Sequence, residues 1–518
     1  MTGRGVTSSP AWRAVLTHAE EVPMPVSVVP VPAPELDATT AELARIPGSR
    51  LADFFAAGTD PVMLRLVWAL DQDRRYLITE TPAAGPEYPE LADVTPAIFA
   101  EQCEIYEQFG IRPAGGKPLN RVAMPPLTDI VLPTLGRRPA EPPRDIHAPH
   151  TVGGQAFEFP FGPVRQAGVE SLYYGLVTSG EELVDLYLFT WHKHRGIELR
   201  AQGRTPQDAL FHIERAEGLG AVGNASAFAA AAEAAMELEV SETGVVSRAI
   251  ALELERLYNH AAAIAGMCQA CGLAVGRAAA EIVLEQLLRL NAAVFGHRYL
   301  FGVVAVGGAR AVPDTAALRS GLPAAWDEFR RTCDELLATN SLLDRLEASG
   351  ILTTADSVRL GLVGPVARAS GVAIDARADH LSRPYTGLGV AVAAGGPGDA
   401  LSRLRVMLAE AAESVRLIGE LLASFDAAAG APGAAGCASS GQASLGPGSG
   451  LGWAESARGE SLAWIDLDAS GRIRRLRLRP AAVRNWRGFD DACRSQNVFT
   501  DIPIIEASFW LTVAGTAR

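Results

Sequence analysis

One group of charged side chains has the types and spacing that proton transfer needs. Glu253, Arg256 and His260 recur three and four residues apart in a segment rich in Ala and Leu, so a helix would place them along one face. Buried charged groups are costly unless they pair, and a line of such groups can relay protons. A satisfied structural network between helices is the alternative, and the sequence leaves both open.

A second pair, Arg195 and Glu198, lies three residues apart in His194-Arg-Gly-Ile-Glu198. At the start of a helix these two side chains would share a face, and Glu198 is a candidate catalytic carboxylate. The alternative is an ion pair that holds a hairpin against a helical bundle. Both interpretations stay open.

The cysteines do not predict a metal site. Cys268-Gln-Ala-Cys271 has no second pair to complete a four-coordinate zinc or cluster site, so we interpret it as two small residues buried on a helix. Six cysteines in 518 residues are no disulfide framework, which predicts a reducing, cytoplasmic compartment. The glycine cluster Ala394-Gly-Gly-Pro-Gly398 is not followed by Gly-Lys-Ser/Thr, so it predicts no phosphate loop.

Composition excludes several classes of function. A net charge of −13 leaves no general basic surface for nucleic acid. The first 30 residues contain no apolar core with a cleavage site, so no secretory signal is expected. The most apolar stretches, such as Leu300 to Gly308, are far shorter than the roughly 20 residues that cross a bilayer. Any association with a membrane would therefore come through a partner.

The elements that must position these residues indicate an α+β protein: a mainly helical bundle with antiparallel β-hairpins, preceded by a small α+β domain. Alternation in Met63–Trp68 and Arg75–Thr79, followed by a helical pattern over 96–109, predicts the small domain. We place the boundaries as an N-terminal arm over 1–45, the small domain over 46–126, a Pro-rich linker over 127–150 and the large domain over 151–518, with a flexible loop at 427–450.

Within the large domain, a hairpin is expected from Ser171 to Leu188 with its turn at Ser179-Gly180, and a second hairpin over 452–479 around Asp468-Ala-Ser-Gly471. Apolar residues at spacings of three and four predict the helices between them. These helices are expected at Ala225–Met236, Ser247–Cys268, Ala278–Phe295, Ala316–Ser349 and Asp399–Phe425.

A series of short motifs follows in a fixed order along the large domain. They are Gly162-Pro-Val-Arg165, Gly180-Glu181, His194-Arg-Gly-Ile-Glu198, Arg215-Ala-Glu-Gly-Leu-Gly-Ala-Val-Gly-Asn224, Glu253-Leu-Glu-Arg-Leu-Tyr-Asn-His260, Gly307-Gly-Ala-Arg310, Gly364-Pro-Val-Ala-Arg-Ala-Ser-Gly371, Glu455-Ser-Ala-Arg-Gly-Glu460 and Asp501-Ile-Pro-Ile-Ile-Glu-Ala-Ser-Phe509. The series resembles the large subunit of energy-converting nickel-iron hydrogenases, such as that of formate hydrogenlyase, and the related hydrogenase-like subunit of respiratory complex I. The small domain resembles, more weakly, the complex I subunit often fused ahead of this one.

The resemblance directs attention to the residues that would hold the metal. The family supplies soft thiolates for nickel and iron as two Cys-x-x-Cys pairs, followed after the first pair by a histidine. In this chain the first pair falls at Glu217 and Gly220, the histidine falls at Asn224, and the second pair falls at Thr512 and Gly515. All four thiolates are absent, so we expect no nickel-iron centre and no metal ligand in this chain.

The replacements resemble complex I in part. An acidic residue stands first (Glu217) and Asn224 replaces the histidine, as in the complex I protein that holds a quinone headgroup in its emptied cavity. The hairpin histidines of that protein are absent here, where Arg165 and Val169 stand, and Gly218 occupies the place of its tyrosine. The chain thus departs from both branches.

The resemblance implies a subunit of a membrane-associated oxidoreductase complex. The expected partners are an iron-sulfur small subunit carrying a 4Fe-4S cluster and, through it, ion-translocating membrane subunits. The chain itself is expected on the cytoplasmic face of the membrane. No cofactor is expected on this chain, and quinone is a candidate electron acceptor. A catalytically silent scaffold is the alternative. Candidate catalytic residues are Glu217, Glu198, Arg195 and His260, and the residues expected to line the vestigial cavity are Arg215, Asn224, Arg310, Arg368 and Thr512.

Overall fold

A computed structural model describes residues 26–58, 61–115, 119, 156–165, 170–380, 382–429, 446–494 and 497–518. These residues form two compact units. The smaller contains the described residues before 120 together with Asp379 and His380, and the larger contains the others. The predicted linker over 127–150 lies outside the described residues.

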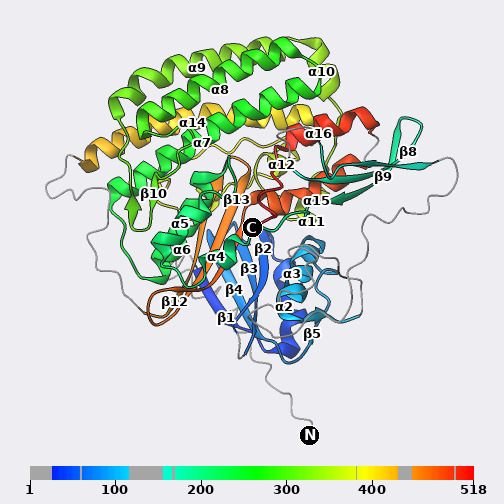
Figure 1. The fold of residues 1–518 in the computed structure, drawn as a ribbon, viewed down its shortest axis with the longest axis vertical. Coiled ribbons are helices and arrows are strands. Elements are labelled where there is room, and N and C mark those ends of the chain that lie inside the picture. Colours follow the sequence, from blue (N-terminus) through cyan, green and yellow to red (C-terminus); the bar gives the residue numbers. More distant parts are fainter. Residues whose placement is uncertain are drawn as a thin grey trace, which may run out of the picture. The chain divides into compact units, whose positions relative to one another are not determined.

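The smaller unit is a four-stranded sheet covered by short helices (Figure 1). The strand order is β1-β4-β3-β2, in which β1 (Val26–Pro30) runs parallel to β4 (Arg75–Pro82), while β2 (Ser49–Ala57) and β3 (Met63–Leu70) extend the sheet antiparallel. Its apolar side chains meet α3 (Phe99–Phe109) in one core. The remaining elements are η1 (Ala33–Glu35), α2 (Leu36–Ala44), β5 (Glu87–Tyr88), η2 (Pro96–Ile98) and β6 (Arg112–Pro113).

The two alternating segments are therefore strands and the 96–109 segment is helical, as predicted. The predicted N-terminal boundary at residue 45 is wrong, because β1, η1 and α2 lie within the proposed arm. Val29 of β1 and Leu36 and Leu43 of α2 are buried in the core of this unit, so its fold begins by residue 26. Proline-rich composition hid a strand that gains its stability from pairing with β4.

Four long helices form the upper layer of the larger unit (Figure 1): α7 (Glu242–Ala270), α8 (Ala274–Phe295), α9 (Thr315–Leu337) and α14 (Ala400–Ala429). The single helix predicted over 316–349 is divided, because Thr339 adopts extended backbone and its hydroxyl donates to the carbonyl of Glu335 (2.9 Å). A second helix, α10 (Asn340–Leu346), begins directly after it.

Two three-stranded antiparallel sheets lie in the larger unit. The first joins β7 (Phe157–Phe161), β8 (Tyr173–Ser179) and β9 (Glu182–Phe189), and the second joins β12 (Gly448–Ser456), β13 (Gly459–Leu467) and β14 (Ile473–Arg479). Both predicted hairpins are confirmed, each with one strand more than expected. Both predicted ends of the loop at 427–450 are wrong, because α14 extends to Ala429 and β12 starts at Gly448; residues 430–445 lie outside the described part.

Small residues let the Ala-rich helix α6 (Ala221–Ala235) pack directly on β12 (Figure 1). A Cβ atom added to Gly452 would lie 2.2 Å from the carbonyl oxygen of Ala227, and one added to Gly450 would lie 2.3 Å from that of Ala231. This close approach fixes the N-terminus of α6 beside the end of β12. The candidate site is built around that N-terminus.

Shorter elements complete the larger unit, and no helix among the described residues is long and apolar enough to cross a membrane. These elements are α4 (Ile197–Ala201), α5 (Pro206–Ile213), β10 (Val304–Ala305), β11 (Gly308–Ala309), α11 (Thr354–Arg359), α12 (Gly364–Ala369), α13 (Ala376–Asp379), α15 (Ala481–Cys493), η3 (Phe499–Asp501) and α16 (Ile502–Phe509).

Candidate functional site

A buried carboxylate joins two segments that lie almost 300 residues apart in sequence. Glu217 lies in the turn between α5 and α6 and is 3% exposed. Its Oε2 accepts a hydrogen bond from Nδ2 of Asn224 (2.9 Å), and its Oε1 accepts one from the hydroxyl of Thr512 in the C-terminal segment. Three of the predicted site residues are thus brought into direct contact.

Two glycines leave the room that this carboxylate occupies. A Cβ atom added to Gly220 would lie 2.8 Å from Oε2 of Glu217, and one added to Gly515 would lie 2.6 Å from Oε1. The Glu217 carboxylate therefore lies between Gly220 and Gly515, with Thr512 and Asn224 bonded to it. All four positions at which the resemblance places metal-binding thiolates converge on one point, and a carboxylate fills it.

The residues at this point do not fit a nickel-iron centre. Glycine has no side-chain donor, the Thr512 hydroxyl is already bonded to Glu217, and the remaining oxygens are hard ligands where that centre needs soft thiolates. Within the described ranges, no group of three or more His, Cys, Asp or Glu side chains is arranged to hold a metal ion.

The Cys-x-x-Cys sequence lies at the far end of α7. Cys268 is buried and Cys271 is the residue that ends the helix; neither forms a disulfide. Burial raises the pKa of the Cys268 thiol to about 12, so this thiol is protonated at neutral pH. The arrangement agrees with two small residues packed on a helix.

A second buried carboxylate caps the N-terminus of α6 beside Glu217. Glu255 of α7 accepts hydrogen bonds from the backbone N–H groups of Val222 (2.7 Å) and Gly223 (2.9 Å). Burial raises the pKa of Glu255 to about 7, although those two N–H groups act to lower it. The helix dipole also favours the ionised form at this end. Glu255 therefore changes its protonation state near neutral pH.

Glu255→Gln is expected to flatten the pH dependence of stability. The folded carboxyl holds its proton more tightly than its ordinary pKa of 4.5 implies, so its contribution is fully present below about pH 4.5 and is lost as the pH rises to about 7. Between about pH 5 and pH 8 the wild type should lose ~2 kcal/mol more stability than the variant. Denaturant unfolding at both pH values measures this difference. Glu239→Gln, at an exposed position, is the control, and an equal slope in both variants would contradict the account.

Two further carboxylates hold the C-terminal segment in place. Glu170, just before β8, accepts the backbone N–H groups of Val513 (2.6 Å) and Ala514 (2.9 Å). Glu198 at the start of α4 accepts Nε of Arg518 (3.1 Å) and the backbone N–H of Leu478 (2.8 Å). Together with Glu217, these residues anchor the chain from Thr512 to its last residue.

Arg195 and Glu198 therefore do not act as a pair. The Arg195 guanidinium reaches Glu170 (3.2 Å) and the carbonyl oxygen of Ala216 (3.0 Å). This ion pair joins the segment before α4 to the segment that enters the β8–β9 hairpin, which agrees with the structural alternative. The predicted shared face of a helix is wrong, because Arg195 precedes α4 and only Glu198 lies in it.

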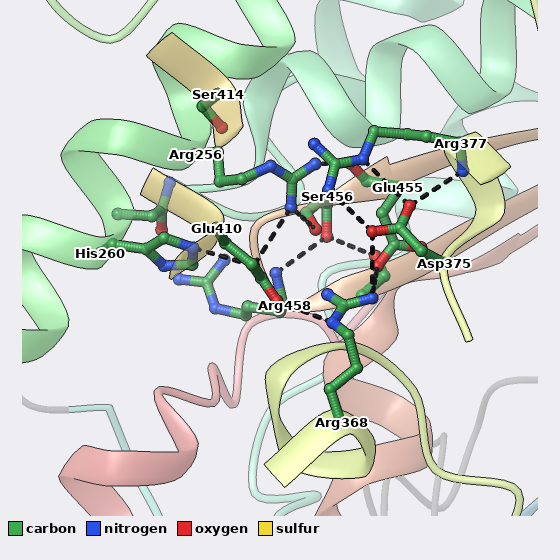
Figure 2. A network of polar contacts seen from close by, with 12 residues as sticks. Arg256, His260, Arg368, Asp375, Arg377, Glu410, Ser414, Glu455, Ser456 and Arg458 are labelled. Atoms are coloured by element: carbon green, nitrogen blue, oxygen red, sulfur yellow. Dashed lines mark hydrogen bonds and ion pairs between the residues drawn. The ribbon is translucent and has the colours of Figure 1, made fainter. Parts of the chain in front are cut away.

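His260 and Arg368 belong to a separate buried network, drawn in Figure 2. The Arg368 guanidinium bonds to Glu410 (2.7 Å), Glu455 (3.0 Å) and Asp375 (3.3 Å), and Nε2 of His260 lies 3.0 Å from the other oxygen of Glu410. Burial lowers the pKa of His260, which favours the neutral ring. Neither residue contacts Glu217 in the described structure, so Arg368 does not line the predicted cavity with it, whereas His260 lies on the charged face of α7 as predicted.

The line of charges on α7 is fully paired. Glu253 receives Arg256 (3.2 Å), Arg377 (2.9 Å) and the hydroxyl groups of Tyr385 (2.7 Å) and Ser414 (2.6 Å). Burial opposes ionisation, but Arg377 and Arg256 lower the pKa of Glu253 to about 2. Glu253 is thus ionised and satisfied, which agrees with a structural network between helices.

Arg215 and Arg310 lie away from the site. Arg215 points outward, where it bonds to Glu214 and stacks on the rings of Phe211 and Phe301. The Arg310 side chain is exposed and makes no hydrogen bond or ion pair with the other predicted residues in the described structure. Their assignment to the cavity lining is wrong, because aromatic stacking and solvation hold these guanidinium groups at the surface.

Arg215→Ala is expected to lower the free energy of unfolding by about 1 kcal/mol or less, because the Arg215 side chain is 41% exposed and the buried Glu214 carboxylate keeps its hydrogen bond from the backbone N–H of Gly302. Thermal or denaturant unfolding of the purified chain measures it. A loss of several kcal/mol would restore a role for Arg215 inside the site.

Several residues of the site were not predicted, although some left a signal. Glu410 falls among apolar residues of a long helix, in phase with Met407 and Ser414, which marks a buried carboxylate. Asp375 and Arg377 lie in a segment without periodicity and gave no signal. Glu170 lies in a polar run before a strand, which did not distinguish it from a solvated residue.

Known proteins resemble this chain over most of its length. The family model described as "Respiratory-chain NADH dehydrogenase, 49 Kd subunit" matches residues 282–433. Formate hydrogenlyase subunit 5 of Escherichia coli (strain K12) is 28% identical over 448 residues, covering 83% of this chain and 76% of its own length. Carbon monoxide-induced hydrogenase of Rhodospirillum rubrum is 28% identical over 373 residues, covering 70% and 99%.

Other similarities point the same way. A subunit of the NADH-quinone oxidoreductase of Roseiflexus sp. (strain RS-1) is 27% identical over 369 residues, covering 68% of this chain and 96% of its own length. A chain in the structure of the membrane-bound sulfane sulfur reductase, an archaeal respiratory membrane complex, superposes with a TM-score of 0.64 at 22% identity, covering 70% and 99%, which shows the shared fold. The chain is thus similar to subunits of hydrogenases and of NADH-quinone oxidoreductases, and its residues 282–433 match the family of the 49-kDa subunit of respiratory-chain NADH dehydrogenase.

Proposed function

We propose that this chain is the large subunit of a membrane-associated, hydrogenase-like oxidoreductase complex and that it works without a nickel-iron centre. It packs against an iron-sulfur small subunit, whose 4Fe-4S cluster carries the electrons, and that subunit links it to ion-translocating membrane subunits on the cytoplasmic face. The relatives, which are named as subunits of such enzymes, support the assembly. The observation that carries the proposal is the Glu217 carboxylate, which fills the point where the four thiolates would meet.

Around the Glu217 carboxylate, the hydrogen bonds favour a scaffold role for the chain over a binding cavity. Glu217 is bonded on both oxygens, and Glu198 is buried and accepts Arg518 and a backbone N–H on its Oε1, so both carboxylates are tied to the protein. These bonds tie the turn before α6 and the start of α4 to the C-terminal segment. The proposed role of the chain is to hold that fold as a docking surface for the redox partner.

Binding of an organic electron acceptor such as a quinone is the second candidate. Two buried polar atoms favour it: Oδ1 of Asn224 and Nη2 of Arg458 have no hydrogen-bond partner in the described structure. Both residues adjoin the turn that carries Glu217, because Nη1 of Arg458 lies 3.4 Å from the carbonyl oxygen of Leu219. A carbonyl-bearing ligand could bond to the guanidinium.

Purification of the native complex through a tag on this chain tests the proposal. We expect an iron-sulfur subunit in equal amount, iron without nickel, and membrane subunits in the same preparation. Stoichiometric nickel, or recovery of the chain alone, would contradict it. Asn224→Leu separates the two candidates: a scaffold predicts unchanged electron transfer per intact complex, whereas an acceptor site predicts loss of electron transfer in a complex that still assembles. Arg310→Gln is the exposed control.

A further inference from the structure

Phenylalanines that a core would normally cover lie open on the first strand of the β7-β8-β9 sheet. Phe157, Phe159 and Phe161 alternate along β7 and therefore face the same side, yet they are 55%, 41% and 43% exposed. Their partners across the strand pair are Thr178, Leu176 and Tyr174, which are all buried. The apolar face of the sheet thus continues onto β7 beyond the part of the core that covers it.

A groove runs beside Phe157 and Phe159, two of these three phenylalanines. It has a volume of about 300 Å³ and lies between the β7–β8 pair and residues 498–500. The rings of Phe159 and Phe499 meet edge to face with centroids 5.4 Å apart and form one part of its wall. An exposed apolar groove on a protein surface marks a place where another molecule binds.

The backbone of β7 is also open. The strand pairs with β8 on one side and with no other strand in the described structure, so its outer edge presents N–H and carbonyl groups. Proteins blunt such edges with charged side chains, prolines, short strands or a covering segment, and β7 (Phe-Glu-Phe-Pro-Phe) has five residues with Glu158 and Pro160 but no lysine. Pro160 removes one N–H group, while the neighbouring positions can still pair. An added strand would gain backbone hydrogen bonds as well as apolar contacts.

Charge around the groove selects the kind of occupant. Glu181 lines the groove and Glu182 follows it, and both are exposed without an ion-pair partner among the described residues. The nearby arginines are already used: Arg345, which bonds to the carbonyl oxygen of Thr500, pairs with Asp501 (3.5 Å), Arg165 pairs with Glu506 (2.9 Å) and Arg494 pairs with Asp185 (3.0 Å). An acidic rim repels a second copy of the same edge and an anionic lipid surface, and it attracts a basic segment.

We propose that β7 and this groove bind an extended segment of a partner subunit, which adds as a fourth strand, places apolar side chains against the phenylalanines and brings a Lys or Arg to Glu181. The inference rests on the proposed function only in that the partner belongs to the same complex. It adds where on this chain the partner binds and what sequence chemistry that partner offers.

Photo-cross-linking within the native complex tests the contact. A benzoylphenylalanine placed at Phe159 is expected to cross-link to a peptide of a stoichiometric subunit, in which apolar residues alternate and at least one Lys or Arg occurs. The same probe at Val358, which is 63% exposed on α11, is the control for general reactivity. A cross-link to a second copy of this chain or to lipid, or the absence of a cross-link to any subunit, would overturn the inference. If the complex nevertheless purifies intact, the proposed function stands.

Charge reversal tests the chemistry of the occupant. Glu181→Lys with Glu182→Lys should weaken retention of the cross-linked subunit about tenfold in a salt wash, and the two Glu→Gln changes should weaken it less. Hydrogen exchange of the β7 amides that face away from β8 should be slow in the complex and fast in the isolated chain. Equal retention of that subunit by the Lys and wild-type forms, or fast exchange in the complex, would contradict strand addition. Recovery of the chain without any subunit would overturn both proposals.

Discussion

Arg368→Met is expected to lower the free energy of unfolding of the larger unit by roughly 3–5 kcal/mol, because it leaves buried carboxylates without their counter-charge. The guanidinium is fully buried and bonds to Glu410, Glu455 and Asp375, which come from α14, β12 and the segment before α13. One side chain thus neutralises acids from three parts of the fold, as Figure 2 shows. Denaturant unfolding followed by tryptophan fluorescence measures the loss.

A surface arginine provides the matched comparison. Arg359 makes two ion pairs, with Asp356 (3.1 Å) and Asp491 (2.6 Å), but its side chain is half-exposed. Arg359→Met should cost about 1 kcal/mol or less. Adding Glu410→Gln to Arg368→Met should restore part of the loss, because it removes one of the unpaired charges. Equal losses for the two arginine variants would contradict the assignment of Arg368 to a buried network.

Glu217→Ala is expected to lower the free energy of unfolding by about 2–4 kcal/mol. The change leaves the Thr512 hydroxyl and the Asn224 amide without their partner and opens a cavity between Gly220 and Gly515. Glu217→Gln keeps the volume and an oxygen for one of the two donors, so its cost should be smaller, about 1–2 kcal/mol. Urea unfolding of the three proteins gives the order. A neutral Glu217→Ala would show that the carboxylate anchors nothing.

Local patterns were sufficient for most elements, and they failed where tertiary contacts decide. Alternation located β3 and β4, and apolar spacing located α7 and α8, because each of these elements buries one regular face. The strand β1 and the break at Thr339 were missed. The first depends on pairing with β4 and the second on a single hydroxyl bond, and neither leaves a periodic signal.

The candidate site was predictable only where two motifs carried it. Glu217, Asn224 and Thr512 come from the two segments that the resemblance aligned with metal ligands, so their meeting was anticipated. The direction of each side chain was not anticipated: Arg215 turns outward although it lies two residues from Glu217. In the buried network around Arg368, the charged face of α7 was predicted correctly. Its partners Arg377 and Glu410 lie more than a hundred residues from α7 in sequence, a separation that no local pattern spans.

A double-mutant cycle between Glu217 and Gly515 tests the central claim most directly, namely that a carboxylate fills the point where the thiolates would meet. Gly515→Ala places a Cβ atom against Oε1 of Glu217 and should cost about 1–3 kcal/mol in the wild type. In the Glu217→Ala background the same change should cost little, or should stabilise the chain, because the new methyl group enters the vacated space. Equal costs in both backgrounds would contradict the claim, because Gly515 would then not face the Glu217 carboxylate.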